Sequence, residues 1–114
     1  MKIIKDKINI GELKKMAGKM FDSLVKAVVD VERKAIAVDA PMHSDEETEL
    51  LQNGSKQKDL WGINLHPRFY GTEDFVEFDS MINLRPGQGN RTRSVDDQKI
   101  REKIIKIVEK LVTK

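Results

Sequence analysis

The sequence predicts an α+β fold, a two-layer domain with helices on one face of a mainly antiparallel sheet of four or five strands. Segments with apolar residues at helical spacing are interleaved with β-branched segments whose apolar residues recur at every second position. The connections between neighbouring strands are too short for crossovers, which favours antiparallel pairing. We predict the order β-α-β-β-α-β-β-α in one domain over residues 1–114.

An edge strand and a capped helix open the chain. Ile3 and Ile4 lie among lysines, which protect an edge strand from pairing with other chains. Asn9 can cap a helix over about residues 10–20, and Glu12 has the position that completes a capping box. The apolar face of this helix would consist of Leu13, Met16, Ala17 and Met20.

A β-hairpin and a second helix follow. Residues 23–31 are rich in valine and alternate with a period of two, and residues 34–39 return as the second strand of the hairpin. Ser44 and Glu47 have the spacing of a capping box, which predicts the start of a short helix. The dipeptide at residues 53–54 is Asn-Gly, a C-terminal stop for that helix.

Two strands and a helix complete the chain. Residues 59–66 and 75–84 alternate as strands on either side of a loop that contains Pro67 and Gly71. Ser94 has the position of a cap for a final helix. The apolar stripe of this helix would consist of Ile100, Ile104, Ile107, Val108 and Leu111.

The composition excludes several classes of protein. The chain has 21 Lys and Arg against 19 Asp and Glu, a net charge of +2, so it is not a polycation. It has no cysteine, which excludes disulfides, zinc–thiolate centres, iron–sulfur clusters and cysteine nucleophiles. No apolar run approaches the ~20 residues of a membrane span, and the first residues lack the apolar core of a signal peptide. We expect a cytoplasmic protein without membrane contact, and no motif calls for a cofactor.

Charge is distributed unevenly along the chain. Residues 1–20 and residues 98–114 each carry six basic against two acidic side chains, whereas residues 39–79 carry ten acidic against three basic. If the two ends of the chain lie side by side, they form a basic patch. The simpler expectation is that these lysines form the solvated faces of amphipathic helices.

Six segments of the chain form a recognisable set. They are residues 19–21, 24–30, 43–47, 54–65, 77–86 and 88–91. Together they resemble a family of small prokaryotic single-domain proteins catalogued as a domain of unknown function, and the resemblance would cover nearly the whole chain. The resemblance implies a stand-alone protein. It carries over no activity, no substrate and no catalytic residue.

The segment between the last predicted strand and the last helix is the leading candidate for a binding site. Its glycines let backbone N–H groups approach a ligand, its arginine forks match phosphate oxygens, and the following helix dipole favours an anion. It is not a Walker A motif, because no Gly-Lys-Ser/Thr follows the glycines. The predicted anion-binding residues are Arg85, Gly87, Gly89, Asn90, Arg91 and Arg93.

We therefore expect a non-enzymatic binding module for a phosphate, a nucleotide or a nucleic-acid backbone. One alternative is a structured turn whose arginines pair with the acidic strands. Another is a small metal-dependent hydrolase or phosphoryl-transfer enzyme that uses Glu77, Asp79 and His43, with the arginines as an anion clamp. The carboxylates have only the two-residue spacing of any solvated strand face, so we assign no catalytic residue and no metal ligand. A homodimer through an open sheet face, or a protein partner, is the remaining hypothesis.

Overall fold

The computed structural model describes residues 1–20 and 23–114, so Phe21, part of the family-like segments, lies outside the described residues. A five-stranded antiparallel sheet in the order β1-β4-β3-β5-β6 forms its centre. The predicted α+β class and antiparallel sheet are confirmed. The strands of this sheet are β1 (Lys2–Ile4), β3 (Val25–Asp30), β4 (Ala35–Val38), β5 (Leu60–Leu65) and β6 (Val76–Glu77).

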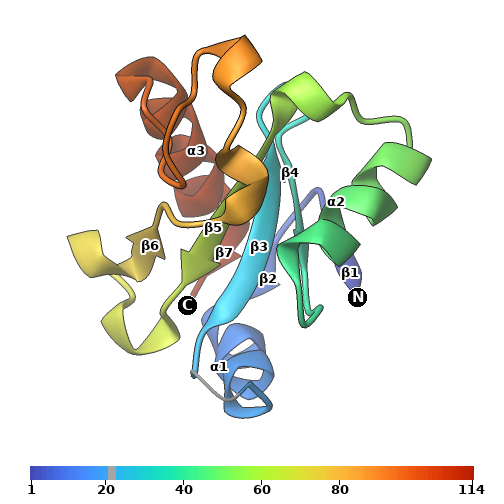
Figure 1. Ribbon diagram of the computed structural model, residues 1–114. Coiled ribbons are helices and arrows are strands. Elements are labelled where there is room, and N and C mark those ends of the chain that lie inside the picture. The colour runs from blue at the N-terminus through green and yellow to red at the C-terminus, as the bar shows by residue number, and fades with distance from the viewer. Residues whose placement is uncertain (21–22) are drawn as a thin grey trace.

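Three helices and a small second sheet accompany the five strands (Figure 1). The helices are α1 (Ile10–Gly18), α2 (His43–Gln52) and α3 (Gln98–Leu111). The second sheet is a parallel pair of short strands, β2 (Ile8–Asn9) and β7 (Val112–Thr113). None of the helices in the described part of the chain has the length and apolar character that a membrane crossing requires.

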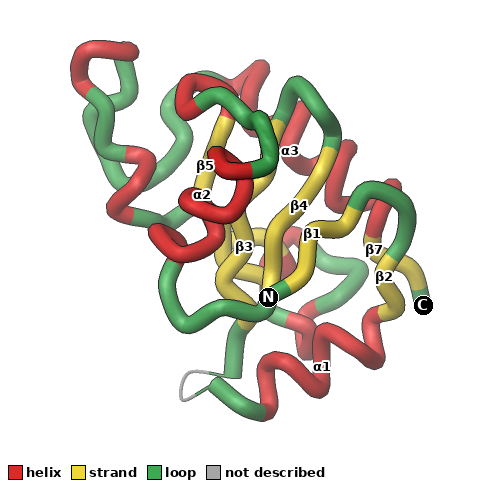
Figure 2. The backbone as a smooth tube through the Cα atoms, turned by 90° about the vertical axis from the view of Figure 1, so that its right-hand side faces the viewer, coloured by secondary structure: helices red, strands yellow, loops and turns green. Residues whose placement is uncertain are grey.

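The helices lie on both faces of the sheet, whereas the sequence analysis expected them on one face. α1 and α3 pack on one side and α2 packs on the other (Figures 1 and 2). The reason is visible in β3, where two consecutive residues are fully buried. Val29 belongs to the core beneath α3, and Val28 packs with Leu50 of α2. A strand buried on both faces needs cover on both faces.

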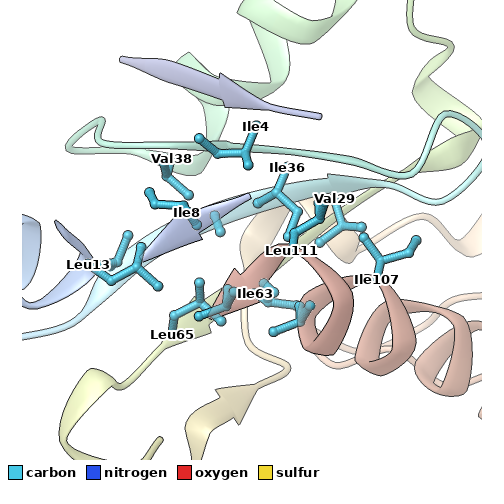
Figure 3. Packing of buried hydrophobic residues seen from close by; sticks show 14 of the residues in the cluster. Ile4, Ile8, Leu13, Val29, Ile36, Val38, Ile63, Leu65, Ile107 and Leu111 are labelled. Carbon is cyan, nitrogen blue, oxygen red and sulfur yellow. The ribbon is translucent and has the colours of Figure 1, made fainter. Parts of the chain in front are cut away.

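The larger core fills the space between the sheet, α1 and α3. Figure 3 shows its side chains converging from strands and helices that are far apart in the sequence. Leu13 of α1, Ile63 of β5 and Ile104 of α3 are completely buried there. Burying a side chain of this size contributes about 1.5–3 kcal/mol. This core therefore fixes the positions of the strands whose other face packs against α2.

Two of the three predicted helix caps are wrong. Asn9 does cap α1, because its Oδ1 accepts a hydrogen bond from the N–H of Gly11 at 2.6 Å. α2, however, begins one residue before Ser44, after Met42, which offers no side-chain hydrogen bond. α3 is capped by Asp97 rather than by Ser94. A thioether cannot accept a backbone hydrogen bond well, so the amino end of α2 is left open.

The predicted strand over residues 75–84 is mostly wrong. Only Val76–Glu77 pairs with β5, and the chain then forms short 3-10 turns at Met81–Asn83 and Pro86–Gln88. The physical reason is a side chain: the amide of Asn83 binds the backbone of Gly62 in β5 at the place where the next strand would pair. The segment after β6 therefore lies over β5 as a turn.

Candidate ligand-binding site

A polar cleft of about 350 Å³ opens on the face of the sheet that carries α2. Its lining residues come from the amino end of α2, from strands β3, β5 and β6, and from the segment that leads towards α3. Its polar lining consists of Lys26, His43, Ser44, Asn64, Glu77, Asp79, Ser80 and Arg93. We call this cavity the polar cleft.

The floor of the polar cleft is a row of three polar side chains across three strands. Lys26 of β3 is directly opposite Asn64 of β5, which is directly opposite Glu77 of β6. Directly opposed residues of an antiparallel sheet point to the same face, with Cβ atoms about 4.5–5.5 Å apart. The row therefore presents an ammonium, an amide and a carboxylate side by side.

The amide of Asn64 has one satisfied end and one unsatisfied end. Its Nδ2 donates to Glu77 Oε1 at 3.0 Å and to the carbonyl of Asp79 at 3.1 Å, which fixes the orientation of the amide. Its Oδ1 is buried without a hydrogen-bond partner in the described structure, and the residue is only 7% exposed. A buried acceptor left unpaired costs about 1–3 kcal/mol. A ligand hydroxyl or amino group would recover that energy.

His43, the first residue of α2, presents a neutral imidazole to the cleft. Its Nε2 lies 2.8 Å from the carbonyl oxygen of Ile63. Because a carbonyl only accepts, Nε2 carries the proton and Nδ1 keeps the lone pair. Burial is the main cause that lowers the pKa of His43, and the charge of Lys26 adds to it. The carbonyl of Ile63 and the side chains of Asp79 and Asn64 act on this pKa in the opposite direction without reversing the shift. The ring is therefore uncharged near neutral pH, with Nδ1 as an acceptor.

The amino end of α2 gives the cleft a positive character. With Met42 as its cap residue, the N–H groups of His43 and Ser44 have no acceptor among the described residues. Unpaired N–H groups and the helix dipole together amount to a partial positive charge. Lys26 adds a full charge, and it forms no ion pair with any residue that the structure describes.

The two carboxylates of the cleft already have partners. Arg93 Nε lies 2.7 Å from Asp79 Oδ1, and both side chains are about half exposed. Burial alone would raise the pKa of Glu77, but hydrogen bonds from Asn64 and from His66 outweigh it and hold the pKa below its ordinary value. Glu77 is therefore ionised at neutral pH and acts as an acceptor.

Two methionines form the rim of the cleft. Met42 is 56% exposed and Met81 is 62% exposed, and both line the opening. Methionine is flexible and polarizable, so exposed methionines adapt to flat apolar groups. The cleft thus combines a polar floor with an apolar opening.

The predicted anion-binding residues separate into two groups. Arg93 lines the cleft. Arg85 does not: its guanidinium donates to the carbonyls of Gln57 and Leu60, each at 2.6 Å, and lies 4.0 Å over the ring of Trp61. This arginine fastens the loop to the start of β5.

The middle of the predicted loop is occupied by its own hydrogen bonds. The Nδ2 of Asn90, a buried residue, donates to three backbone carbonyls, and its Oδ1 accepts from the N–H of Asp96 at 2.8 Å. Gly89 adopts a left-handed φ of 87° and donates its N–H to Pro86, whereas Gly87 is exposed. The N–H of Arg91 donates to the carboxylate of Asp96 at 2.8 Å. Anion binding by this loop stays a prediction.

The structure also brings together the residues of the alternative enzyme hypothesis. Glu77, Asp79 and His43 all line the polar cleft. No group of three or more histidine, aspartate and glutamate side chains in the described part of the chain is arranged to hold a metal ion. The set therefore suits hydrogen bonding and proton transfer better than metal binding.

Sequence reasoning missed Lys26 and Asn64. Each is a polar residue in the middle of a strand whose other residues are almost all apolar. A polar side chain at a buried strand position must form hydrogen bonds or bind a ligand, because burying it unpaired is costly. The presence of a polar residue in an apolar strand was therefore a signal that the sequence analysis could have used. His43 lies beside them because α2 begins at this residue. The sequence pattern predicted that the helix begins after Ser44, so it did not place His43 there.

Comparison with known proteins gives a family and no activity. No curated protein and no solved structure matches the chain. A family described as "Protein of unknown function (DUF5674)" matches residues 2–111, which is nearly the whole chain. The resemblance expected from the sequence is confirmed, and the chain belongs to this family of proteins of unknown function.

Proposed function

We propose that the protein binds a small organic phosphate, such as a mononucleotide, in the polar cleft. The observation that carries this proposal is the convergence of Lys26, Arg93 and the open amino end of α2 around the unpaired Oδ1 of Asn64. The volume of about 350 Å³ is within the range of small-molecule pockets.

The phosphate would occupy the positive part of the cleft. Lys26 and the N–H groups of His43 and Ser44 supply donors without an acceptor in the described structure. A helix N-terminus with a nearby lysine is a common arrangement for phosphate oxygens. The neutral ring of His43 adds no negative charge that would repel the phosphate.

Arg93 can join the phosphate at small cost. Its ion pair with Asp79 is about half exposed on both sides. Such pairs contribute about 0–1 kcal/mol, so turning the guanidinium from the carboxylate to a phosphate is inexpensive. This is the one arginine of the predicted loop that the fold places at the cleft.

The hydrogen-bond acceptors of the cleft and the methionines at its rim indicate what the rest of the ligand contains. Asn64 Oδ1 and the carboxylate of Glu77 call for hydroxyl or amino donors, as a sugar provides. Met42 and Met81 suit a planar ring above them. A phosphate, a hydroxylated middle and a flat ring together describe a nucleoside phosphate.

An amide NMR titration at low salt tests the proposal. Adenosine monophosphate, adenosine and inorganic phosphate are added separately to the labelled protein. We expect shifts at Lys26, His43 and Asn64 with the monophosphate, and at least tenfold weaker binding of adenosine. Arg93→Ala should weaken binding of the monophosphate about tenfold, whereas Arg91→Ala, an exposed arginine that does not line the cleft, should change it less than twofold.

Two results would reject the cleft as the site. The first is a set of shifts confined to residues 85–91, which would instead support the predicted loop. The second is an equal loss of affinity in Arg93→Ala and Arg91→Ala, which would indicate general attraction between charges.

A second function, hydrolysis of the bound phosphate ester, is favoured by the tautomer of His43. With Nε2–H held by the carbonyl of Ile63, the lone pair on Nδ1 can take a proton from water. The hydroxide formed bonds to phosphorus, and the bond from phosphorus to the leaving oxygen breaks with its electron pair. This variant of the enzyme hypothesis uses no metal ion.

Hydrolysis of p-nitrophenyl phosphate, followed as release of nitrophenolate, tests this second function. His43→Gln keeps a donor for the carbonyl of Ile63 but has no base. We expect at least a hundredfold lower kcat in this variant with little change in KM. If the original protein and His43→Gln hydrolyse the ester at equal rates, His43 is not the base. A rate that depends on added Mg²⁺ would favour the metal-dependent enzyme.

A further inference from the structure

A second cavity, of about 680 Å³, lies between α3, the turn that joins β3 to β4, and the connection from β1 to β2. It shares no residue with the polar cleft. Figure 2 shows the β1–β2 connection on the same side of the molecule as α3. The charged residues that line this second cavity are Lys5, Glu32, Arg33, Lys34, Lys103, Lys106 and Lys110. We call this cavity the basic groove.

The basic groove brings the two ends of the chain together. Lys5 comes from the basic first twenty residues, and the lysines of α3 come from the basic last segment. The turn between β3 and β4 adds Arg33 and Lys34 from a third place in the sequence. The sequence analysis expected a basic patch if the two ends of the chain lie side by side. Such a patch forms, and the turn between β3 and β4 enlarges it.

The positive charge of the groove is not neutralised within the protein. None of its six cationic side chains forms an ion pair with a residue that the structure describes. Glu32 is the single carboxylate among the lining residues. The guanidinium of Arg33 is engaged at the end of α2, where its Nη1 donates to the carbonyl of Asn53 at 2.6 Å, so the charge that the groove offers comes mainly from its five lysines. A concave surface with one sign of charge focuses the field that attracts a counter-ion.

Helix α3 contributes three lysines to the basic groove. Lys103, Lys106 and Lys110 line it, at the spacing of one helix face. Glu102 and Glu109 do not line the groove; they border a neighbouring surface beside Phe78, to which Arg101 and Lys106 also belong. The three lysines span about 10 Å of helix axis, which corresponds to about three nucleotides of one DNA strand.

The lining also defines what kind of polyanion fits. None of the residues that line the groove is aromatic, so the groove offers no surface on which a base could stack. Its apolar floor is formed by Val31, Ile107 and Leu111, and the last two are almost completely buried. The exposed large apolar side chains of the described residues lie elsewhere, so the groove lacks the anchors of a protein interface.

We infer that the basic groove binds the phosphate backbone of nucleic acid without sequence preference. Repeated, evenly spaced negative charge suits five lysines from three segments, and no lining residue offers a stacking surface for a base. This inference does not depend on the polar cleft or on its ligand.

Fluorescence anisotropy with a labelled 20-base-pair duplex tests the inference. The test variant carries Lys103→Gln, Lys106→Gln and Lys110→Gln. The matched control carries Lys14→Gln, Lys15→Gln and Lys19→Gln, which remove the same charge from exposed positions of the first helical segment. At 50 mM NaCl we expect at least tenfold weaker binding for the α3 variant and less than twofold for the control. The slope of log K against log salt should fall in magnitude by about 2–3 for the α3 variant alone.

Three results would overturn the inference. One is the absence of saturable binding at 50 mM NaCl. Another is an equal loss in the two triple variants, which would indicate net charge rather than the groove. The third is tighter binding of a poly-glutamate peptide of matched charge than of the duplex, which would point to an acidic protein partner. Equal thermal melting of the two variants shows that folding does not cause the difference.

Discussion

Asn83 binds both backbone groups of Gly62 with a single side chain. Its Oδ1 accepts from the N–H of Gly62 at 2.8 Å, and its Nδ2 donates to the carbonyl of Gly62 at 2.9 Å and to that of Arg93 at 3.0 Å. The amide thus replaces a neighbouring strand where β6 has ended. It also connects β5 to the segment that carries Arg93 into the polar cleft.

Asn83→Ala should therefore destabilise the protein strongly. The substitution leaves buried backbone groups of Gly62 unpaired, each at a cost of about 1–3 kcal/mol, so we expect the free energy of unfolding to fall by about 3 kcal/mol. Urea denaturation measures this quantity. The control is Asn53→Ala, an exposed amide that bonds within the end of α2, for which we expect a loss below about 1 kcal/mol. A similar loss in both variants would contradict the bridging role of Asn83.

Gly62 is also required for close packing. A Cβ atom at this position would lie 2.5 Å from the Cβ and Oγ atoms of Ser80, closer than such atoms approach. We expect Gly62→Ala to lower the free energy of unfolding by about 1–3 kcal/mol. Adding Ser80→Gly removes the obstructing atoms and should restore part of that loss in a double-mutant cycle. Additive losses would show that the two positions are not coupled.

A second glycine supplies the matched control. Among the described residues, no atom beyond the neighbouring residues and the backbone of α1 itself lies within 4 Å of a Cβ placed at Gly18, which ends α1. Gly18→Ala should leave stability unchanged or raise it by up to about 1 kcal/mol, because alanine has fewer conformations to lose on folding. Urea denaturation of the two alanine variants under one set of conditions gives the comparison. A clear loss in Gly18→Ala would mean that any added side chain disturbs this protein.

Hydrophobic periodicity was sufficient to predict most of the fold. Alternation along residues 23–31 and 34–39 identified the central hairpin, and helical spacing identified α1 and α3. These patterns succeed because each element buries one continuous apolar face. They could not reveal that β3 is buried on both faces, because a run of valines is consistent with cover on either side.

The candidate site was less predictable because side-chain contacts decide it. Residues 75–84 alternate like a strand, yet the amide of Asn83 competes for the same backbone groups and ends the pairing. The loop around Arg85 has the composition of an anion site, yet carbonyls of its own chain accept the donors of that arginine. Sequence pattern specifies which groups are available, and only the packed chain shows which are already used.

Two arginines of the predicted loop, Arg85 and Arg91, should behave differently. Arg85 donates to two carbonyls and lies over Trp61, so Arg85→Ala removes hydrogen bonds and a cation–π contact. We expect the free energy of unfolding to fall by about 2–3 kcal/mol, with a change in tryptophan fluorescence of the folded state. Arg91→Ala, at an exposed residue, should change stability by less than about 0.5 kcal/mol. If Arg85→Ala is as stable as Arg91→Ala, the carbonyl contacts are not structural.

Arg85→Lys separates charge from geometry at the same position. Lysine keeps the positive charge but cannot reach two carbonyls as a planar fork or stack on the indole. We expect it to recover less than half of the stability that alanine loses in urea denaturation. Full recovery would show that charge alone matters at this position.

Glu46 makes stability depend on pH. Its side chain lies completely buried in α2, and burial raises its pKa to about 9, with further repulsion from Asp45 and Asp39 and an opposing effect of Lys26. The backbone of Ala40 lowers this pKa somewhat, but neither carboxylate oxygen has a partner in hydrogen-bond geometry. The folded protein therefore holds Glu46 protonated at neutral pH.

The sign of the pH dependence follows from the two states of this carboxyl. Below its ordinary pKa of 4.5 the carboxyl is protonated in both the folded and the unfolded chain, so folding takes up no proton and stability does not change with pH through this group. Between pH 4.5 and about 9 the folded state binds one proton more than the unfolded state. Stability then falls as pH rises, by up to about 1.4 kcal/mol per pH unit.

Glu46→Gln removes this dependence because an amide is neutral at every pH. We expect the free energy of unfolding of the variant, relative to the original protein, to rise by about 3 kcal/mol between pH 5.5 and pH 8. Urea denaturation at several pH values measures it. Leu50→Ala, a buried residue of the same helix with no titratable group, should lower stability by a constant amount over this range. If the Glu46→Gln difference is also constant with pH, the carboxyl is not held protonated by the fold.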